Sequence, residues 1–179
     1  MKTEREIRYR GRVFDLVLEH IRHPSGEVTV REIASHPGGA VAVPLLADGR
    51  VLLVRQFRYP VGEEILELPA GRLHPGEDPR LAAARELEEE TGWKAARWEK
   101  LAAIFTTPGF CSEVLHLFLA TELAPLPGGP RREEGEQGMS VHMLPFREAL
   151  RMAETGLIRD GKTLAGLLLA ERRMQRKEG

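Results

Sequence analysis

The fold is decided by residues 71–93, which read Gly71-Arg-Leu-His-Pro-Gly-Glu77-Asp-Pro-Arg-Leu-Ala-Ala-Ala-Arg85-Glu86-Leu-Glu88-Glu89-Glu90-Thr-Gly92-Trp93. Residues 71–78 contain two glycines and a proline and predict a loop. Asp78 and Pro79 are typical of the N-cap and the first position of an α-helix, and Gly92 is typical of a residue that ends one. The stretch therefore predicts a loop followed by a helix from residue 79 to about residue 91.

Three acidic side chains gather on one side of that predicted helix. At about 100° per residue, Glu86 and Glu90 lie one turn apart and Glu89 lies on the neighbouring row. Like charges packed in this way repel each other, and a hard divalent cation such as Mg²⁺ or Mn²⁺ would offset the repulsion. The alternative is a solvent-exposed acidic face whose ion-pair partners are Arg80 and Arg85.

The other side of the same helix is apolar. Leu81, Ala84 and Leu87 fall mostly opposite the acids, and we expect them to be buried. The acids would then face outward or into a cleft.

The composition is typical of one folded domain, and we expect it to extend over residues 1–179. Of these, 42% are hydrophobic and 30% charged. Apolar runs such as residues 164–170 are far shorter than the roughly 20 residues that span a bilayer, so no membrane partner is expected. A formal net charge of -1 argues against a nucleic-acid partner. The lone Cys111 and a charged N-terminus without an apolar signal segment point to the reducing cytoplasm.

Periodicity and turn residues predict the elements around the helix. We expect an N-terminal antiparallel hairpin of residues 12–22 and 27–33. Residues 40–47 and 50–58 are expected to form a second hairpin, because Asp48-Gly49 is typical of a two-residue turn. The remaining expected elements are strands at 64–70, 98–106, 114–121 and 139–143, a helix at 145–154, a last helix capped by Asp160, and a long loop at 123–138. This mixture predicts an α/β domain with helices packed on a mixed sheet.

The spacing of residues 71–93 resembles the Nudix box. It places, without a gap, glycine, five residues, glutamate, seven residues, arginine-glutamate, an aliphatic residue, any residue, two glutamates, any residue, glycine and an apolar residue. The chain therefore resembles the Nudix hydrolases, which use Mg²⁺ or Mn²⁺ to cleave a nucleoside diphosphate linked to another group. The resemblance implies an α/β/α sandwich.

The same resemblance implies roles for the residues at the box positions. The candidate catalytic residues are Arg85, Glu86, Glu89 and Glu90. The three glutamates would also be metal ligands, together with the backbone carbonyl of Ala70, and Glu77 would tie the loop to the helix. Metal ions held in this way neutralise charge on a leaving phosphate and activate the attacking water.

Two segments outside the box resemble the ADP-ribose pyrophosphatase subfamily, namely Thr107-Pro-Gly-Phe-Cys-Ser-Glu113 and Val54-Arg-Gln-Phe-Arg-Tyr-Pro60. This likeness implies hydrolysis of ADP-ribose to AMP and ribose 5-phosphate. It implies that Arg58 contacts a phosphate or the adenine side, that Gln56 supports Arg58, and that Glu113 reaches the ribose hydroxyls. The remaining substrate-binding candidates are Arg55, Gly109 and Phe110.

Other interpretations stay open at this point. FAD, NADH or another nucleoside diphosphate conjugate are alternative substrates, and a catalytically silent nucleotide-binding sensor is an alternative of another class. Arg55 and Arg58 also fit a solvent-facing strand row, and Phe110 also fits an anchor of its turn.

The resemblance finally implies a catalytic base and a partner. Subfamily members often use a glutamate of the loop before the last strand, so Glu136 is the first candidate for the base and Glu134 the second. Members are commonly homodimers, and residues 1–36 are expected to lie in the dimer contact.

Overall fold

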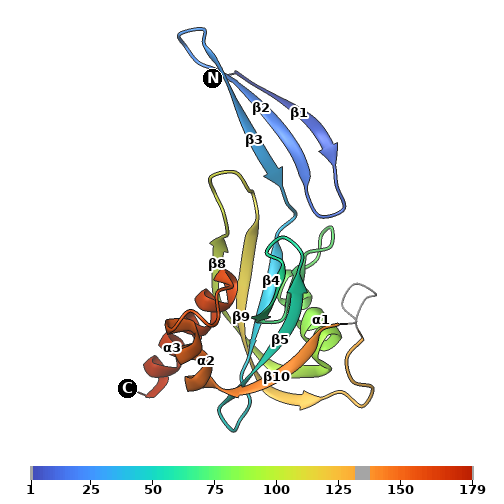
Figure 1. Cartoon of the computed structure of the whole chain (residues 1–179), viewed down its shortest axis with the longest axis vertical. Coiled ribbons are helices and arrows are strands. Elements are labelled where there is room, and N and C mark those ends of the chain that lie inside the picture. Colours follow the sequence, from blue (N-terminus) through green and yellow to red (C-terminus); the bar gives the residue numbers. More distant parts are fainter. Residues whose placement is uncertain (1, 132–137, 179) are drawn as a thin grey trace. The chain divides into compact units, whose positions relative to one another are not determined.

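The computed structural model describes residues 2–131 and 138–178 and divides the chain into two compact units. The first unit contains residues 1–38 and 105–114, and the second contains residues 39–104 and 115–179. Figure 1 shows the elements of both units. Within the described residues, no helix has the length and apolar character needed to cross a membrane.

The first unit is built on a three-stranded antiparallel sheet in the order β1-β2-β3. Its strands are β1 (Lys2–Arg10), β2 (Asp15–Arg22) and β3 (Val28–Ser35). The predicted N-terminal hairpin is confirmed as β2 and β3. Strand β1 was not predicted, because the charged residues of this segment outweigh the alternating Ile7 and Tyr9 in a sequence pattern.

The second unit contains two sheets. One has the order β7-β4-β9-β8, with β4 parallel to β9 and antiparallel to β7, so the sheet is mixed as predicted. The other has the order β10-β5-β6 and is antiparallel. Their strands are β4 (Gly39–Pro44), β5 (Arg50–Arg58), β6 (Glu63–Glu67), β7 (Ala70–Arg72), β8 (Trp93–Phe105), β9 (Val114–Pro125) and β10 (Ser140–Pro145).

The predicted hairpin of residues 40–47 and 50–58 is wrong. The turn itself forms, since Leu46 N donates to Arg50 O at 2.8 Å. Beyond an isolated bridge between Leu45 and Val51, however, the two strands enter different sheets. The reason is that both edges of β4 are already paired, one with β7 and one with β9.

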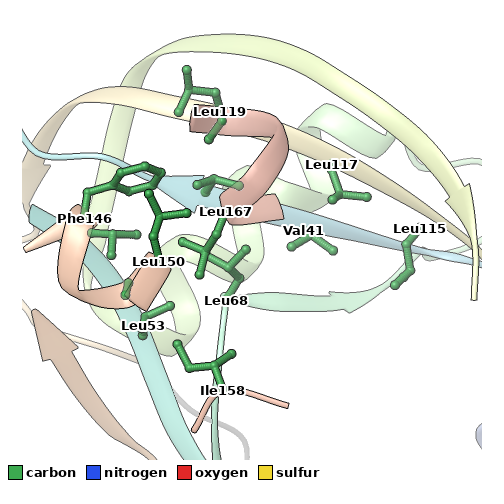
Figure 2. Packing of buried hydrophobic residues seen from close by; sticks show 14 residues of the cluster. Val41, Leu53, Leu68, Leu115, Leu117, Leu119, Phe146, Leu150, Ile158 and Leu167 are labelled. Carbon is green, nitrogen blue, oxygen red and sulfur yellow. The ribbon is translucent and has the colours of Figure 1, made fainter. Parts of the chain in front are cut away.

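Helices cover both faces of the β4–β9 pair, which confirms the α/β/α sandwich. They are α1 (Pro79–Thr91), α2 (Phe146–Glu154) and α3 (Gly161–Glu178). Alternate residues of β4 point to opposite sides: Ala40 and Ala42 belong to clusters with α1, whereas Val41 and Val43 belong to the cluster with α2 and α3. Figure 2 shows this larger cluster, with Val41, Leu117, Leu150 and Leu167 packed together.

The buried face of α1 differs from the predicted one. Leu81 is 52% exposed, whereas Ala82, Ala83 and Leu87 are completely buried. The small alanines face Ala40 of β4 and allow the helix to approach the sheet closely. As a result the buried face also includes Glu86 and the acid one turn later, Glu90.

Candidate functional site

The acidic helix α1 begins and ends as its sequence predicts. The Asp78 carboxylate accepts hydrogen bonds from the backbone N–H of Arg80 at 2.9 Å and of Leu81 at 3.2 Å. At the other end Gly92 adopts φ 73°, and its N–H donates to Glu88 O at 3.0 Å. Glycine is favoured there because other side chains strain in this left-handed conformation. These caps fix where the helix begins and ends, while the packing of Ala82, Ala83 and Leu87 against the sheet fixes the side to which each acid points.

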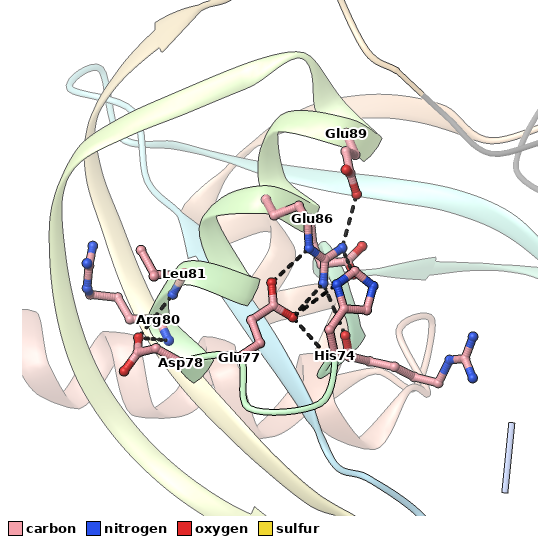
Figure 3. A network of polar contacts seen from close by, with 9 residues as sticks. His74, Glu77, Asp78, Arg80, Leu81, Glu86 and Glu89 are labelled. Atoms are coloured by element: carbon pink, nitrogen blue, oxygen red, sulfur yellow. Dashed lines mark hydrogen bonds and ion pairs between the residues drawn. The ribbon is translucent and has the colours of Figure 1, made fainter.

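Arg85 is the centre of the polar contacts around the box. Its Nε and Nη2 donate to the two Glu77 oxygens at 3.0 and 3.1 Å, which ties the loop to the helix. Its Nη1 donates to Glu86 at 2.6 Å and to Glu89 at 3.1 Å. The hydrogen bonds from Arg85 lower the pKa of Glu77 to about 2, and those with Glu77 raise the pKa of Arg85. Figure 3 shows these contacts around Glu77, Glu86 and Glu89.

Gly71 leaves the space that the Glu86 carboxylate occupies. A Cβ atom built on Gly71 would lie 2.0 Å from Glu86 Oε1, so any larger residue would displace the acid. Glu86 itself is only 8% exposed. The first glycine of the box therefore has a steric function in placing Glu86, the glutamate that follows the box arginine.

Glu90 is held by the backbone of strand β7. It is 2% exposed, and its Oε2 accepts a hydrogen bond from the backbone N–H of Ala70 at 3.2 Å. Ala70 belongs to β7, where it pairs with Val41 of the central strand β4. The structure thus brings the Glu90 carboxylate and the Ala70 N–H together, and the ligand roles of Glu90 and of the Ala70 carbonyl stay predictions.

The carboxylate oxygens of these acids are suitable ligands for a hard divalent cation. Three carboxylates, those of Glu77, Glu86 and Glu89, contact the guanidinium of Arg85, so acids outnumber cations among these four side chains. Within residues 2–131 and 138–178, no three histidine, cysteine, aspartate or glutamate side chains lie close enough together to hold one ion. Arg85 Nη1 contacts both Glu86 and Glu89 and so holds these two carboxylates next to each other.

A cavity of about 280 Å³ adjoins these acids. Its lining residues are Arg85, Glu88, Glu89 and Arg131. The backbone N–H of Arg131 donates to Glu89 O at 2.8 Å, so the loop after β9 returns along the end of α1. Arg131 was missed in the sequence, where nothing distinguishes it from other loop arginines.

The predicted substrate residues of β5 have partners within the second unit. Arg58 donates from Nε and Nη2 to the buried carboxylate of Glu67 at 2.5 and 2.7 Å, while 41% of its side chain remains exposed. Arg55 pairs with Glu64 at 3.2 Å on an exposed face, which matches the solvent-facing row. Gln56 is half-buried. Their contacts with a substrate stay predictions.

The other predicted residues lie elsewhere in the chain. Gly109, Phe110 and Glu113 belong to the first unit. Phe110 forms a turn in which its N–H donates to Thr107 O at 3.2 Å, and 58% of Phe110 is exposed. Glu134 and Glu136 lie outside the described residues, so the choice of base stays a prediction.

Comparisons with known proteins identify the family of this chain. A family model described as the NUDIX domain matches residues 36–173. The ADP-ribose pyrophosphatase of Bacillus subtilis (strain 168) is 39% identical over 155 residues, which are 87% of this chain and 83% of that protein. The methanol dehydrogenase activator of Bacillus methanolicus is 37% identical over 164 residues, which are 92% of this chain and 87% of that protein.

A solved structure extends the likeness to the fold. It is described as an ADP compounds hydrolase, and it superposes with a TM-score of 0.83 at 20% identity, covering 99% of this chain and 96% of that chain. The family model covers most of the chain, and the residues that it spans include the complete box. This chain therefore belongs to the NUDIX domain family.

Proposed function

We propose that this chain is a Nudix pyrophosphohydrolase that hydrolyses ADP-ribose to AMP and ribose 5-phosphate with Mg²⁺ as its cofactor. The observation that carries the proposal is the intact box, in which Arg85 binds Glu86 and Glu89 while Glu90 is fixed at Ala70. Hydrolases of this family generally need divalent metal ions. The choice of ADP-ribose is supported by the Bacillus subtilis relative at 39% identity.

The reaction is an attack of water on one phosphorus of the substrate, with cleavage of the bond to the bridging oxygen. The residues that would hold the metal are Glu86, Glu89, Glu90 and the Ala70 carbonyl. When bound, a divalent ion neutralises charge on the phosphates and lowers the pKa of water. Arg85 fixes the directions of Glu86 and Glu89, and this preorganisation is the main contribution that a protein makes to phosphoryl transfer.

The substrate-binding residues are part of the same proposal. Arg58 would present the exposed part of its guanidinium to a phosphate, because Glu67 already fixes the other edge. Gln56 would support Arg58, and Glu113 would accept hydrogen bonds from the ribose hydroxyls. Arg55, Gly109 and Phe110 are the remaining proposed substrate-binding residues. Glu136, or else Glu134, would activate water.

We also propose that the enzyme is a cytoplasmic homodimer with residues 1–36 in the contact. The sheet β1-β2-β3 exposes several apolar side chains, namely Ile7, Tyr9, Val28 and Val30. A second copy that covers them would remove apolar surface from water. Sedimentation equilibrium should give twice the chain mass, and a monomer at micromolar concentration contradicts this part.

The test of the main proposal is product identification. Purified protein is incubated with ADP-ribose, FAD, NADH or a sugar nucleotide, with Mg²⁺ or with EDTA, and the products are measured by mass spectrometry. We expect AMP and ribose 5-phosphate from ADP-ribose with the highest kcat/KM of the panel, and no product with EDTA. Tight binding of ADP-ribose without turnover would instead indicate a sensor, and turnover in EDTA would contradict the metal.

A further inference from the structure

Outside the box, the second unit contains a cluster of charged groups around the buried carboxylate of Glu67. Glu67 is 1% exposed, accepts two hydrogen bonds from Arg58 and forms an ion pair with Lys162. Lys162 also contacts Asp160 at 3.0 Å. Two carboxylates thus face two cations, and this balance offsets the cost of burying charge.

The cluster determines the ionisation of its central acid. Burial alone would raise the pKa of Glu67, but the hydrogen bonds from Arg58 and the charge of Lys162 outweigh burial and lower it. Glu67 therefore remains a carboxylate. Hydrogen bonds to Glu67 raise the pKa of Arg58, and the charges of Glu90 and Asp160 add to this effect, so Arg58 lies within electrostatic reach of the box.

A hydrogen-bonded path leads from the first turn of α3 to the box. Asp160 accepts from the N–H and the hydroxyl of Thr163 at 3.0 and 2.6 Å, which fixes the hydroxyl. That hydroxyl accepts from the N–H of Leu68 at 2.8 Å, in a completely buried position. Two residues later the N–H of Ala70 donates to Glu90 at 3.2 Å.

The path is held by close packing as well. A Cβ atom on Gly166, one turn after Thr163, would lie 2.4 Å from Leu68 Cδ1, so this glycine lets α3 lie directly against the segment. On the other side the N–H of Ala42 donates to Pro69 O at 2.9 Å. Residues 67–70 are therefore fixed between α3, β4 and the box helix.

We propose that Glu67, Lys162 and Thr163 are positioning residues of the metal site, through which the first turn of α3 holds the Ala70 backbone and Glu90 in place. None of the three touches the substrate or the metal. They act through the backbone of residues 67–70 and through the Arg58 guanidinium. The inference rests on the proposed function, because it assigns the Ala70 carbonyl and Glu90 to a divalent ion.

The experiment measures Mn²⁺ binding to the whole protein without substrate, by electron paramagnetic resonance of the free ion. Thr163→Val removes the hydroxyl that accepts from Leu68 and keeps the shape of the side chain. We expect it to raise the dissociation constant about 10-fold, as is typical for the loss of a group behind a metal ligand. Thr163→Ser keeps the hydroxyl and should bind within a few-fold of the wild type.

The titration distinguishes a displaced metal ligand from a loss of folded protein. A loss of folded protein lowers the number of Mn²⁺ sites per chain, whereas a displaced ligand changes the dissociation constant at an unchanged number of sites. The matched control is Arg159→Gln, which removes an exposed pair with Glu63 at the same end of α3 and should bind Mn²⁺ normally. If Thr163→Val does not fold, Lys162→Met is measured and should also raise the constant.

Two negative results are distinguishable. If Thr163→Val binds Mn²⁺ with the wild-type dissociation constant, the inference is overturned but the proposed function is not. The same holds for Lys162→Met if the valine variant does not fold. If the wild-type protein binds no Mn²⁺, or binds it equally after Glu86→Gln, the proposed metal site fails and the inference fails with it.

Discussion

The second unit holds two ionic networks of opposite balance. Around Arg85 three carboxylates share one cation, and the acids Glu86 and Glu89 meet at the same guanidinium nitrogen. Around Glu67 two carboxylates face two cations, Arg58 and Lys162. The first network lies beside a cavity, whereas the carboxylate at the centre of the second is 1% exposed.

This difference distinguishes a network that is suited to binding a ligand from a network that stabilises the fold. An excess of acids is costly to pack, and it becomes favourable only when a further cation binds, so such a network is suited to a metal. A balanced cluster needs nothing from outside and stabilises the elements that contribute to it. Neutralising one acid should therefore affect catalysis in the first network and stability in the second.

The largest expected effect is on stability, in the balanced cluster. Glu67→Gln leaves Arg58 and Lys162 without their shared charge, and loss of one partner of a buried ion pair costs about 3 kcal/mol of unfolding free energy. Part of the cost is relieved because Lys162 keeps Asp160. Urea denaturation at pH 7 measures the change.

The matched control lies on the same strand. Glu64 pairs with Arg55, and both side chains are about half exposed, so Glu64→Gln should cost less than about 1 kcal/mol. Equal costs in the two variants would mean that the buried cluster contributes no more than a surface pair.

The next effect is on catalysis, in the acid-rich network. Glu86→Gln and Glu90→Gln should each lower kcat for ADP-ribose by at least about 100-fold, because each removes a charged oxygen ligand. Unfolding free energy should change by less than about 1 kcal/mol, since the glutamine oxygen still accepts hydrogen bonds. Steady-state kinetics and urea denaturation are measured on the same preparations.

Glu88→Gln is the control within the helix. Glu88 occupies the unspecified position of the box, so its kcat should stay within a few-fold of the wild type. Wild-type turnover in both Glu86→Gln and Glu90→Gln would rule out the metal site. A severe loss of stability in these variants would instead mean that the two acids mainly stabilise the fold.

The local spacing of residues 71–93, together with the family resemblance that this spacing carries, predicted the acid-rich network, whereas the fold was predicted only in part. The caps Asp78 and Gly92, the contacts of Arg85 and the loop carboxylate Glu77 all lie within one short segment, so their spacing determines their geometry. The pairing of β4 with β9 joins residues about 75 positions apart, and the Asp48-Gly49 turn suggested a local hairpin instead. Turn chemistry specifies a turn but not which strands pair beyond it.

The balanced cluster could not be predicted for the same reason. Glu67 is a charged residue in the apolar run Ile65-Leu66-Glu67-Leu68, which is a signal for a buried acid. Its partner Lys162 is 95 residues away, however, and Asp160 was predicted only as a helix cap. That cap is confirmed by the N–H of Thr163, but its link to Glu67 depends on how α3 packs, which spacing does not encode.

The smallest expected effect concerns acid sensitivity at the edge of the first network. Arg85 lowers the pKa of Glu77 to about 2 from 4.5, so this carboxylate stabilises the fold above about pH 4.5 and loses its contribution as the pH falls towards 2. Solvent around the loop screens the pair, and we expect about 1 kcal/mol at pH 7. Urea denaturation of the wild type and Glu77→Gln should differ by this amount at pH 7, and the difference should shrink below about pH 4.5 and be lost near pH 2, where protonation makes the two side chains alike in charge. A difference that is constant from pH 7 to pH 2 would mean that Glu77 acts through its hydrogen bonds and not through its charge.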